Sequence, residues 1–523
     1  MLWSGWGDPA EATALAPEVL DLLHDALGVR AETPAVALDE VRLPEPRLGD
    51  AIRGRLSRVV GEEHVCEDRP ARLLHTRGKS TPDLLRIRSG QADDAPDAVV
   101  FPGSHDEVLD LLRVCSEERV AVVPFGGGTS VVGGLEPQRE GFDAVVALDL
   151  RRLNRLLELD ELSRTATLEP GLRGPAAEAL LAANGYTIGH HPQSFEFATI
   201  GGFAAARSSG QASAGYGRFD ERVVGLRVAT PRGTVDLGRA PKSAAGPDLR
   251  QLFLGSEGVL GVITAVRLEM RPVPAVRVYD GWRFASFAVG IDGLRRLVQD
   301  GPVPTVLRLS DEAETGLNLT RPTERSAGSA GGALAITGYE GTEADVEARR
   351  GGVSAVLREL GAELDPQAGR AWEHGRYRGP YLRDAMLDAG ALAETLETTS
   401  FWSGLQGLYE AVGTALRDTL TGLCTPPVVL CHVSHVYPSG ASLYFTVGCA
   451  QLADPLAQWR AAKTAASEAI IVTGGSITHH HGVGIDHREH LAREVGPLAV
   501  DALKAMKATF DPAGILNPGV LVG

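Results

Sequence analysis

The residues best suited to bind a phosphate group form a run at 126–130 with the sequence Gly-Gly-Gly-Thr-Ser. The run follows an apolar segment at 120–124 that is typical of a buried strand. Glycines let main-chain N–H groups approach a pyrophosphate closely, and the two hydroxyl groups add further donors. The run therefore predicts a phosphate-binding loop, although a tight turn without a ligand accounts for one glycine triplet equally well.

Two common nucleotide-binding motifs do not fit this run. A P-loop requires Lys followed by Ser or Thr after its last glycine, and neither pair follows here. A Rossmann fingerprint requires a third glycine and then a helix, whereas position 131 is Val and the stretch 131–143 holds three glycines and a proline. Asp149 has the spacing of a ribose-binding acid. Without the intervening helix, we interpret it as the end of a strand.

Candidates for acid–base chemistry occur in the second half of the chain. Tyr444 lies in the strand-like run 442–447, where a tyrosine usually packs in a core with its hydroxyl satisfied. A phenol with an ordinary pKa of ~10 needs cationic or hydrogen-bonding partners to accept a proton at neutral pH. Arg383 and the three consecutive histidines at 479–481 are candidate partners that could lower its pKa.

Arg383 also belongs to a cationic group with Arg370, Arg376 and Arg378, in a chain of net charge −16. Such residues often form a solvated helix face, but one guanidinium inside a pocket binds a carboxylate or phosphate through two hydrogen bonds. The negative net charge argues against nucleic-acid binding, which requires a basic face. An anionic small molecule is the ligand that this group would fit.

The histidine run invites a metal interpretation, which its spacing does not favour. Consecutive side chains of a strand point in opposite directions, so at most His479 and His481 could face one ion while His480 points away. His487 and His490, three residues apart, are expected on a solvated helix face. No CxxC pair is present. The sequence therefore predicts no metal site.

These residues need a scaffold, and the apolar pattern predicts alternating strands and helices. Ser104, with Glu107 three residues later, marks the start of a helix that continues through Cys115. Pro272 and Pro274 mark a boundary, after which strands and long helices are mixed. Residues 1–92 favour helices and loops, and the expected strands that follow are 97–101, 120–124, 144–149, 165–169, 223–230 and 261–271.

The cysteine content bears on the compartment. Five widely spaced cysteines, an odd number, do not indicate a disulfide framework. The first residues lack the basic and apolar regions of a signal peptide, and no apolar run approaches the ~20 residues of a membrane helix. We therefore expect reduced thiols and a cytoplasmic protein, and the sequence leaves a peripheral contact with a membrane surface open.

Several separate segments together resemble one flavoprotein family. That family is the FAD-linked oxidases of the vanillyl-alcohol-oxidase type, which have several flavin-lining motifs and a C-terminal motif. This chain has similar segments at 124–130, 192–202, 206–209, 255–263 and 511–519. Within that family the chain most resembles the alkyldihydroxyacetonephosphate (alkylglycerone-phosphate) synthases. This closer match rests on the Trp- and Gly-rich first residues and on 308–311, 380–384, 441–445 and 479–484.

The resemblance implies an α+β fold, with a two-subdomain FAD-binding domain of the vanillyl-alcohol-oxidase type and a mixed α/β cap domain. The implied parts are an N-terminal helical region at 1–92, the FAD-binding domain at 93–273, the cap domain at 274–485 and a C-terminal segment at 486–523 that returns to the FAD domain. No histidine lies in the glycine loop, so FAD is expected to bind non-covalently. The implied cofactor-binding residues are Pro124, Phe125, Gly126, Gly127, Gly128, Thr129, Ser130, Gln193, Ser194, Thr199, Gly201, Gly202, Ala206, Arg207, Ser208, Ser209, Glu257, Gly258, Gly261, Val262 and Ile263.

The resemblance also implies a reaction of ether lipid synthesis. The family's substrate is an acyl-dihydroxyacetone phosphate, whose fatty acid is exchanged for a fatty alcohol through a flavin N5 adduct, without net redox change. Tyr444 would move the substrate proton, Arg383 would bind an anionic group, and Arg308 would support them. The three histidines would assist proton movement around the phosphate or the leaving group. The family also suggests a homodimer.

The alternative is an FAD-dependent dehydrogenase or oxidase of a 2-hydroxy acid or alcohol, and a flavin-binding protein without turnover is a third interpretation. Hydroxy-acid dehydrogenases of this fold carry a His-Gly-Asp-Gly-Asn-x-His type metal segment. The corresponding stretch, 435–444, lacks the acidic residue and has Tyr444 in place of the second histidine. Losing a carboxylate and an imidazole removes that metal site, which favours the synthase.

Overall fold

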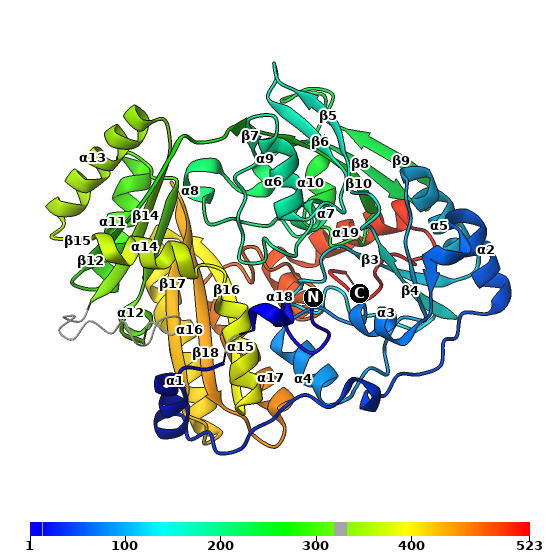
Figure 1. Cartoon of the computed structure of the whole chain (residues 1–523), viewed down its shortest axis with the longest axis horizontal. Helices are drawn as coiled ribbons and strands as arrows, with labels where there is room; N and C mark the ends of the chain where they lie inside the picture. Colours follow the sequence, from blue (N-terminus) through cyan, green and yellow to red (C-terminus); the bar gives the residue numbers. More distant parts are fainter. Residues whose placement is uncertain (13, 318–331, 523) are drawn as a thin grey trace.

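Three main sheets organise the computed structural model, which describes residues 1–12, 14–317 and 332–522 (Figure 1). Figure 1 shows the long strands of the second half of the chain on one side of the molecule and two smaller sheets on the other. A two-stranded ribbon pairs β7 (Tyr186–Thr187) with β11 (Arg271–Pro272). In the sequence, β11 comes directly before the first strand of the large sheet. The combination of helices and largely antiparallel sheets confirms the predicted α+β class.

A four-stranded sheet carries the glycine loop. Its order is β1-β2-β4-β3, and β2, β4 and β3 run parallel. Helices α2 (Asp50–Val60) and α5 (His105–Glu117) contribute to its core. Because β3 ends where the glycine run begins, the loop lies at the carboxyl end of a parallel strand, where α/β sheets bind ligands. The strands are β1 (Val65–Cys66), β2 (Ala98–Val100), β3 (Val120–Phe125) and β4 (Ala144–Asp149).

A five-stranded antiparallel sheet of order β5-β6-β10-β8-β9 forms the second layer. The C-terminal segment returns beside the first sheet, because Val122 donates to the Ile515 carbonyl at 2.8 Å and accepts from Asn517 N at 2.8 Å. The elements of this layer are β5 (Leu156–Asp160), β6 (Thr165–Leu168), β8 (Val223–Thr230), β9 (Gly233–Leu237), β10 (Val262–Glu269), α6 (Gly174–Ala182), α7 (Ile200–Ala205), α10 (Arg250–Phe253) and α19 (Pro497–Phe510).

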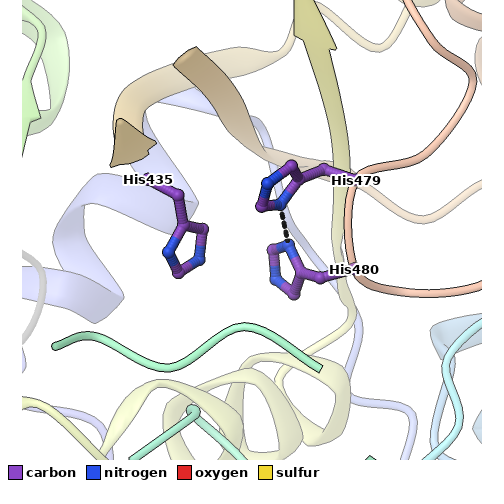
Figure 2. A group of neighbouring side chains, drawn as sticks. All are labelled: His435, His479 and His480. Carbon is purple, nitrogen blue, oxygen red and sulfur yellow. Dashed lines mark hydrogen bonds between the residues drawn. The ribbon is translucent and has the colours of Figure 1, made fainter. Parts of the chain in front are cut away.

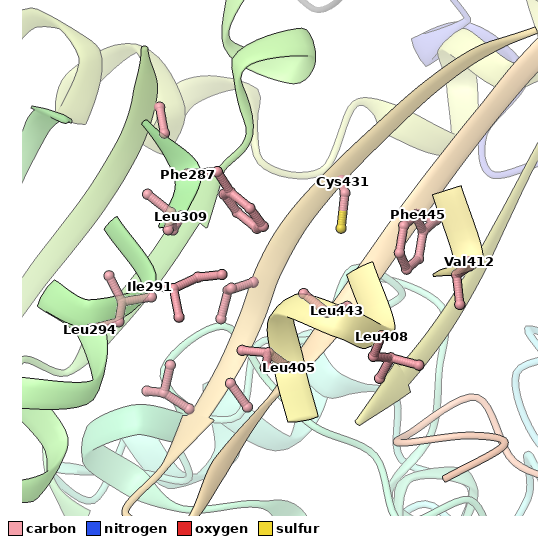
Figure 3. Packing of buried hydrophobic residues seen from close by; sticks show 14 of the residues in the cluster. Phe287, Ile291, Leu294, Leu309, Leu405, Leu408, Val412, Cys431, Leu443 and Phe445 are labelled. Atoms are coloured by element: carbon pink, nitrogen blue, oxygen red, sulfur yellow. The ribbon is translucent and has the colours of Figure 1, made fainter. Parts of the chain in front are cut away.

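The third sheet has seven antiparallel strands in the order β15-β12-β14-β13-β17-β18-β16. Its strands alternate between two faces, as antiparallel strands with one packed face do. Leu443 and Phe445 lie in the apolar core shown in Figure 3, while Tyr444 and Thr446 face a cavity. The strands are β12 (Val276–Phe284), β13 (Val306–Ser310), β14 (Ala333–Gly341), β15 (Glu363–Asp365), β16 (Ala391–Phe401), β17 (Val428–Tyr437) and β18 (Gly440–Ala450).

Long helices cover the core face of this sheet, and shorter ones flank the cavity. The core-side helices are α11 (Phe287–Gln299), α13 (Glu343–Glu359), α16 (Trp402–Gly422) and α17 (Pro455–Val472). Helices α14 (Pro366–Gly375) and α15 (Gly379–Asp388) contribute to the cavity wall. Among the described helices, none has the length and apolar character needed to cross a membrane.

The remaining helices are short. Most of them precede residue 92, where the sequence predicts helices and loops. The domain boundaries stay predictions. They are η1 (Pro9–Glu11), α1 (Pro17–Asp21), η2 (Leu22–Ala26), η3 (Leu38–Glu40), η4 (Glu62–His64), α3 (Arg69–Leu74), α4 (Thr81–Arg88), α8 (Ser213–Tyr216), α9 (Phe219–Arg222), α12 (Glu312–Leu317) and α18 (Arg488–Val495).

Candidate active site

A cavity of about 990 Å³ separates the glycine loop from the seven-stranded sheet. All of the predicted cofactor-binding residues except Arg207 line it. The predicted catalytic and substrate-binding residues that also line it are Tyr444, His480, His481, Arg308 and Arg383. Segments that are hundreds of residues apart in the sequence therefore meet at one site.

The glycine loop packs directly against the segment 197–199 because it lacks side chains. A Cβ atom at Gly127 would overlap the Phe197 carbonyl oxygen, and one at Gly126 would overlap the Thr199 hydroxyl. Gly128 has a φ of +70°, which favours glycine. No described residue accepts a hydrogen bond from the N–H groups of 126–130. Such a cradle of unpaired donors fits the pyrophosphate of a dinucleotide.

Arg207 differs from the other predicted cofactor-binding residues. Its partly exposed guanidinium lies next to α10, where it donates to the carbonyl oxygens of Leu254 at 2.9 Å and Gln251 at 3.1 Å. It also forms an ion pair with Asp220 at 3.2 Å. The side chain of Arg207 therefore lies outside the cavity lining and supports the turn after α10, and its predicted role in binding the cofactor stays a prediction.

Glu257 joins the flavin-lining segment to the segment that follows the histidines. Its carboxylate accepts hydrogen bonds from Val483 N and Gly484 N, both at 3.0 Å. Burial raises its pKa to about 7, although these two hydrogen bonds lower it.

Tyr444 lies on the cavity face of β18, directly opposite His432 of β17. The two rings stack with their centroids 4.9 Å apart, and the rings of His481 and His480 lie 5.5 and 6.3 Å from the tyrosine ring. Burial raises the pKa of Tyr444 to about 12. Arg383 lowers this pKa, as expected of a cationic neighbour, and so does the hydrogen bond with Thr395, but desolvation outweighs both effects.

Behind this stack, Arg308 belongs to a partly buried charge network. It donates to Glu314 Oε1 at 2.5 Å and lies 3.1 Å from His432 Nδ1. Glu314 also contacts His432 at 3.0 Å, and although burial would raise the pKa of Glu314, these two partners hold it at about 2. The network fixes the imidazole against which Tyr444 stacks. Sequence reasoning included Arg308 but missed both Glu314 and His432.

Arg383 of α15 also lines the cavity and is held by hydrogen bonds of its guanidinium. It pairs with the neighbouring Asp384 at 3.0 Å and donates to the Lys79 carbonyl oxygen at 2.5 Å. Asp384 in turn accepts a hydrogen bond from Trp6 N. This explains the Trp- and Gly-rich start of the chain, since the Gly5 and Gly7 positions leave no room for side chains beside Asp384 and Tyr381.

The three histidines do not occupy equivalent positions. His480 and His481 line the cavity, whereas His479 lies behind them, with Nε2 2.6 Å from the Tyr437 hydroxyl and Nδ1 2.9 Å from His480 Nδ1. The structure thus places His479 outside the cavity lining, where it supports its neighbour, and its predicted catalytic role stays a prediction. Figure 2 shows His435 beside the pair formed by His479 and His480. Sequence reasoning did not place His435 there.

The ring nitrogens of His435, His479 and His480 lie within 4.8 Å of one another, which is close enough to consider a metal site. His435 Nδ1, however, already contacts the hydroxyl groups of Ser209 at 3.0 Å and Ser213 at 2.7 Å. Both nitrogens of His479 are also engaged. An ion would have to break these hydrogen bonds, so the group is better suited to moving protons.

Burial lowers the pKa of each of these histidines, and it lowers that of His481 to about 3. They are therefore neutral imidazoles at neutral pH, and burial makes them weak bases that hold an added proton only briefly. His487 also differs from expectation. It is buried at 1% exposure, contacts the Gly482 carbonyl at 2.9 Å and immediately precedes α18, so it does not lie on a solvated face.

The comparisons with known proteins agree with this geometry. The model of the FAD binding domain matches residues 96–237, and that of the C-terminal domain of FAD linked oxidases matches 273–521. Alkyldihydroxyacetonephosphate synthase of Dictyostelium discoideum is 32% identical over 569 residues, covering 99% of this chain and 93% of that protein. This chain belongs to the alkyldihydroxyacetonephosphate synthase family. The synthase of Trypanosoma brucei brucei is also 32% identical, with 99% and 92% covered.

Solved structures place the synthase family within a wider fold. One alkyldihydroxyacetonephosphate synthase structure has a TM-score of 0.84 at 31% identity, covering 99% of this chain and 98% of that one. Substrate-bound p-cresol methylhydroxylase has a TM-score of 0.69 at 17% identity over 91% and 98% of the two chains, which shows a shared fold alone. Both matching domain models are of FAD enzymes, so this protein is an FAD-dependent enzyme.

Proposed function

We propose that this enzyme exchanges the fatty acid of an acyl-dihydroxyacetone phosphate for a fatty alcohol, which gives an ether lipid precursor. The observation that carries the proposal is that one cavity contains the glycine cradle, the phenol of Tyr444 among neutral histidines, and a long apolar wall. That wall is formed by Val19, Leu22, Leu23, Leu27, Leu382, Met386, Val428 and Leu430. An alkyl or acyl chain fits such a wall because it is removed from water there.

The side chains divide the work between binding and proton movement. Arg383, fixed by Asp384, binds the anionic group of the substrate. Tyr444 moves the substrate proton, and the neutral imidazoles of His480 and His481 receive or return it near the leaving group. When bound, FAD would supply the flavin ring at which the substrate carbon exchanges its acyl oxygen for the oxygen of the alcohol. The bond between the dihydroxyacetone phosphate carbon and the acyloxy oxygen breaks, and the same carbon forms a bond to the alcohol oxygen. The alcohol gives up its proton, and the fatty acid leaves with both of its oxygens, without net oxidation.

The test is anaerobic exchange of labelled free fatty acid into acyl-dihydroxyacetone phosphate, followed by product analysis with a long-chain alcohol. The proposal expects exchange without any electron acceptor and an ether product. A substrate that is oxidised in step with reduction of an added acceptor would instead establish the dehydrogenase alternative. A flavin that reacts with no anionic lipid would support a binding protein without turnover.

Catalysis is expected to need no divalent metal. The β17–β18 hairpin has Tyr444 where related dehydrogenases have a metal-ligating histidine, and the imidazoles near it are engaged with one another and with hydroxyl groups. Exchange activity should therefore be unchanged, within a factor of about two, after treatment with EDTA and gel filtration. Activity that is lost on chelation and returns with Zn²⁺ or Mn²⁺ would contradict this expectation.

We further propose a cytoplasmic location and non-covalent FAD. Five cysteines without a disulfide support the first, and the absence of a histidine in the glycine loop supports the second. Acid precipitation should release FAD into the supernatant, and a yellow pellet would contradict the second proposal. A homodimer and a peripheral membrane contact stay predictions.

A further inference from the structure

The three-histidine segment is attached to the large sheet through one buried carboxylate that sequence reasoning missed. Glu397 of β16 is 1% exposed and accepts hydrogen bonds from the N–H groups of His479 at 2.6 Å, His480 at 3.0 Å and His481 at 2.9 Å. The Thr478 hydroxyl donates to the same group at 2.6 Å. Three consecutive backbone donors thus converge on a single side chain.

This arrangement keeps Glu397 negatively charged. Burial alone would raise its pKa, but the neighbouring histidines and the Thr478 hydroxyl hold it well below the ordinary value. Successive N–H groups form an anion-binding concavity, and hydrogen bonds to a carboxylate favour its ionised form. The charge lies close to the imidazoles, since Oε2 is 3.8 Å from His480 Nδ1.

The position of Glu397 also relates it to Tyr444. The two residues are direct partners in the β16–β18 ladder, so their side chains leave the sheet on the same face. The carboxylate therefore sets the distance between the histidine segment and the strand that carries the phenol. The 5.5 Å separation between the rings of His481 and Tyr444 depends on this attachment.

The far end of the segment is fixed independently. Glu257, from the flavin-lining side, accepts hydrogen bonds from Val483 N and Gly484 N. Gly484 has a φ of +54° and no room for a Cβ beside Val132. Loss of the Glu397 contacts should therefore displace the histidines locally without releasing the segment.

We propose that Glu397 is the positioning residue of this segment: it fixes the backbone of 479–481 so that His480 and His481 face Tyr444, and its charge stabilises a proton on these imidazoles. The inference rests on the proposed function of the site. Other charged or titratable groups around the imidazoles are Arg218, whose guanidinium donates to the His479 carbonyl at 3.1 Å, and Lys463, His435 and Tyr444. Arg218 and Lys463 disfavour an imidazolium, so Glu397 is the group that opposes them.

The test compares Glu397→Gln, Glu397→Asp and a control, Asp280→Asn. Glutamine keeps one acceptor oxygen but places an NH₂ group against one of the three N–H donors, and it removes the charge. Aspartate keeps the charge and shortens the side chain by one methylene. Asp280 is a buried carboxylate of the same sheet, paired with Arg350 and away from the cavity.

Glu397→Gln should lower kcat for fatty acid exchange by about 10²-fold through misplaced histidines, with little change in KM or FAD content. Removing a negative charge disfavours the imidazolium, so the histidine-dependent limb of the pH profile should move to lower pH. The NMR resonance of His480, assigned with His480→Gln in histidine-labelled protein, should titrate at lower pH as well. Glu397→Asp should lower kcat but keep the wild-type pH limb.

Each outcome either supports or overturns the positioning role of Glu397. Wild-type kcat and an unmoved His480 titration in Glu397→Gln would overturn the inference, as would a loss of FAD and stability equal to that in Asp280→Asn. If Glu397→Gln does not fold, Glu397→Asp decides: a lower kcat with the wild-type pH limb supports the inference, and a wild-type kcat overturns it. If wild-type protein shows no exchange, the proposed function fails, while the His480 titration still tests the role of Glu397.

Discussion

The variant Tyr444→Phe is expected to keep FAD and its fold while fatty acid exchange falls by about 10²–10⁴-fold, the range for losing a positioned acid or base. The change removes one hydroxyl and keeps the ring, so the stacking on His432 at 4.9 Å is preserved. The reaction cannot proceed efficiently because no other phenol faces this part of the cavity among the described lining residues.

The raised pKa of Tyr444, about 12, strengthens this prediction. A phenol that stays protonated across neutral pH has a proton to donate, and it can accept one only when a neighbouring imidazole takes its own proton in the same step. The neutral imidazoles of His480 and His481 lie beside it, with ring centroids 6.3 and 5.5 Å from the tyrosine ring, and their lowered pKa values allow them to hold that proton only transiently. The phenylalanine variant interrupts that route while leaving the imidazoles in place.

A matched control is Tyr339→Phe. Tyr339 is fully buried on β14 of the same sheet, and its hydroxyl contacts Thr337 at 3.1 Å on the core side of the structure. Losing this hydrogen bond should lower the free energy of unfolding by about 1 kcal/mol and leave exchange unchanged. Equal exchange rates in Tyr444→Phe and wild type would refute the assigned proton transfer, and the flavoprotein assignment would survive that result.

The local structure around the glycine loop was predictable because it depends on short-range signals. The expected helix from Ser104 is confirmed as α5, with the Ser104 hydroxyl accepting from Glu107 N at 3.1 Å. The Glu107 carboxylate accepts a hydrogen bond from Gly103 N and not from Ser104 N. The spacing of Ser104 and Glu107 in the sequence does not distinguish these two donors. Asp149 ends β4 as interpreted, where it pairs with His75 at 2.8 Å.

The partners of Tyr444 were not predictable, because one bulge decides them. Tyr437 pairs with Gly440 at the hairpin turn, and regular pairing from that turn would place Val433 opposite Tyr444. A register shift between Val433 and Val436 moves His432 into that position instead. A one-residue slip exchanges the two faces of a strand, so the sequence pattern alone could not bring His432 to the cavity.

The carboxylates of the site were missed for a different reason. Glu314 and Glu397 are acidic residues in ordinary helix and strand surroundings, with no spacing that marks them. Their roles arise only when β13, β16 and β17 come together and present histidines and backbone N–H groups to them. The histidine segment was treated as a strand with alternating side chains, whereas its N–H groups converge on Glu397.

The variant Gly127→Val should weaken FAD binding by roughly 10–100-fold, which corresponds to the 1–3 kcal/mol that overpacking costs. A Cβ atom at this position would overlap the carbonyl oxygen of Phe197, which belongs to the backbone and cannot rotate away. The loop must then shift, and its N–H groups lose their alignment on the pyrophosphate. Flavin content after gel filtration, and FAD titration of the apoprotein, would measure the loss.

The control for this variant is Gly407→Val. Gly407 lies exposed on α16, where a Cβ meets nothing within 4 Å, so this change should leave FAD content at the wild-type level. The same side chain is thus added in an open and in a crowded position. If Gly127→Val retained full FAD content with wild-type affinity, the loop would be a structural turn, and the phosphates would have to bind elsewhere in the cavity. If both variants lost FAD equally, the effect would be general destabilisation and not obstruction of the phosphate cradle.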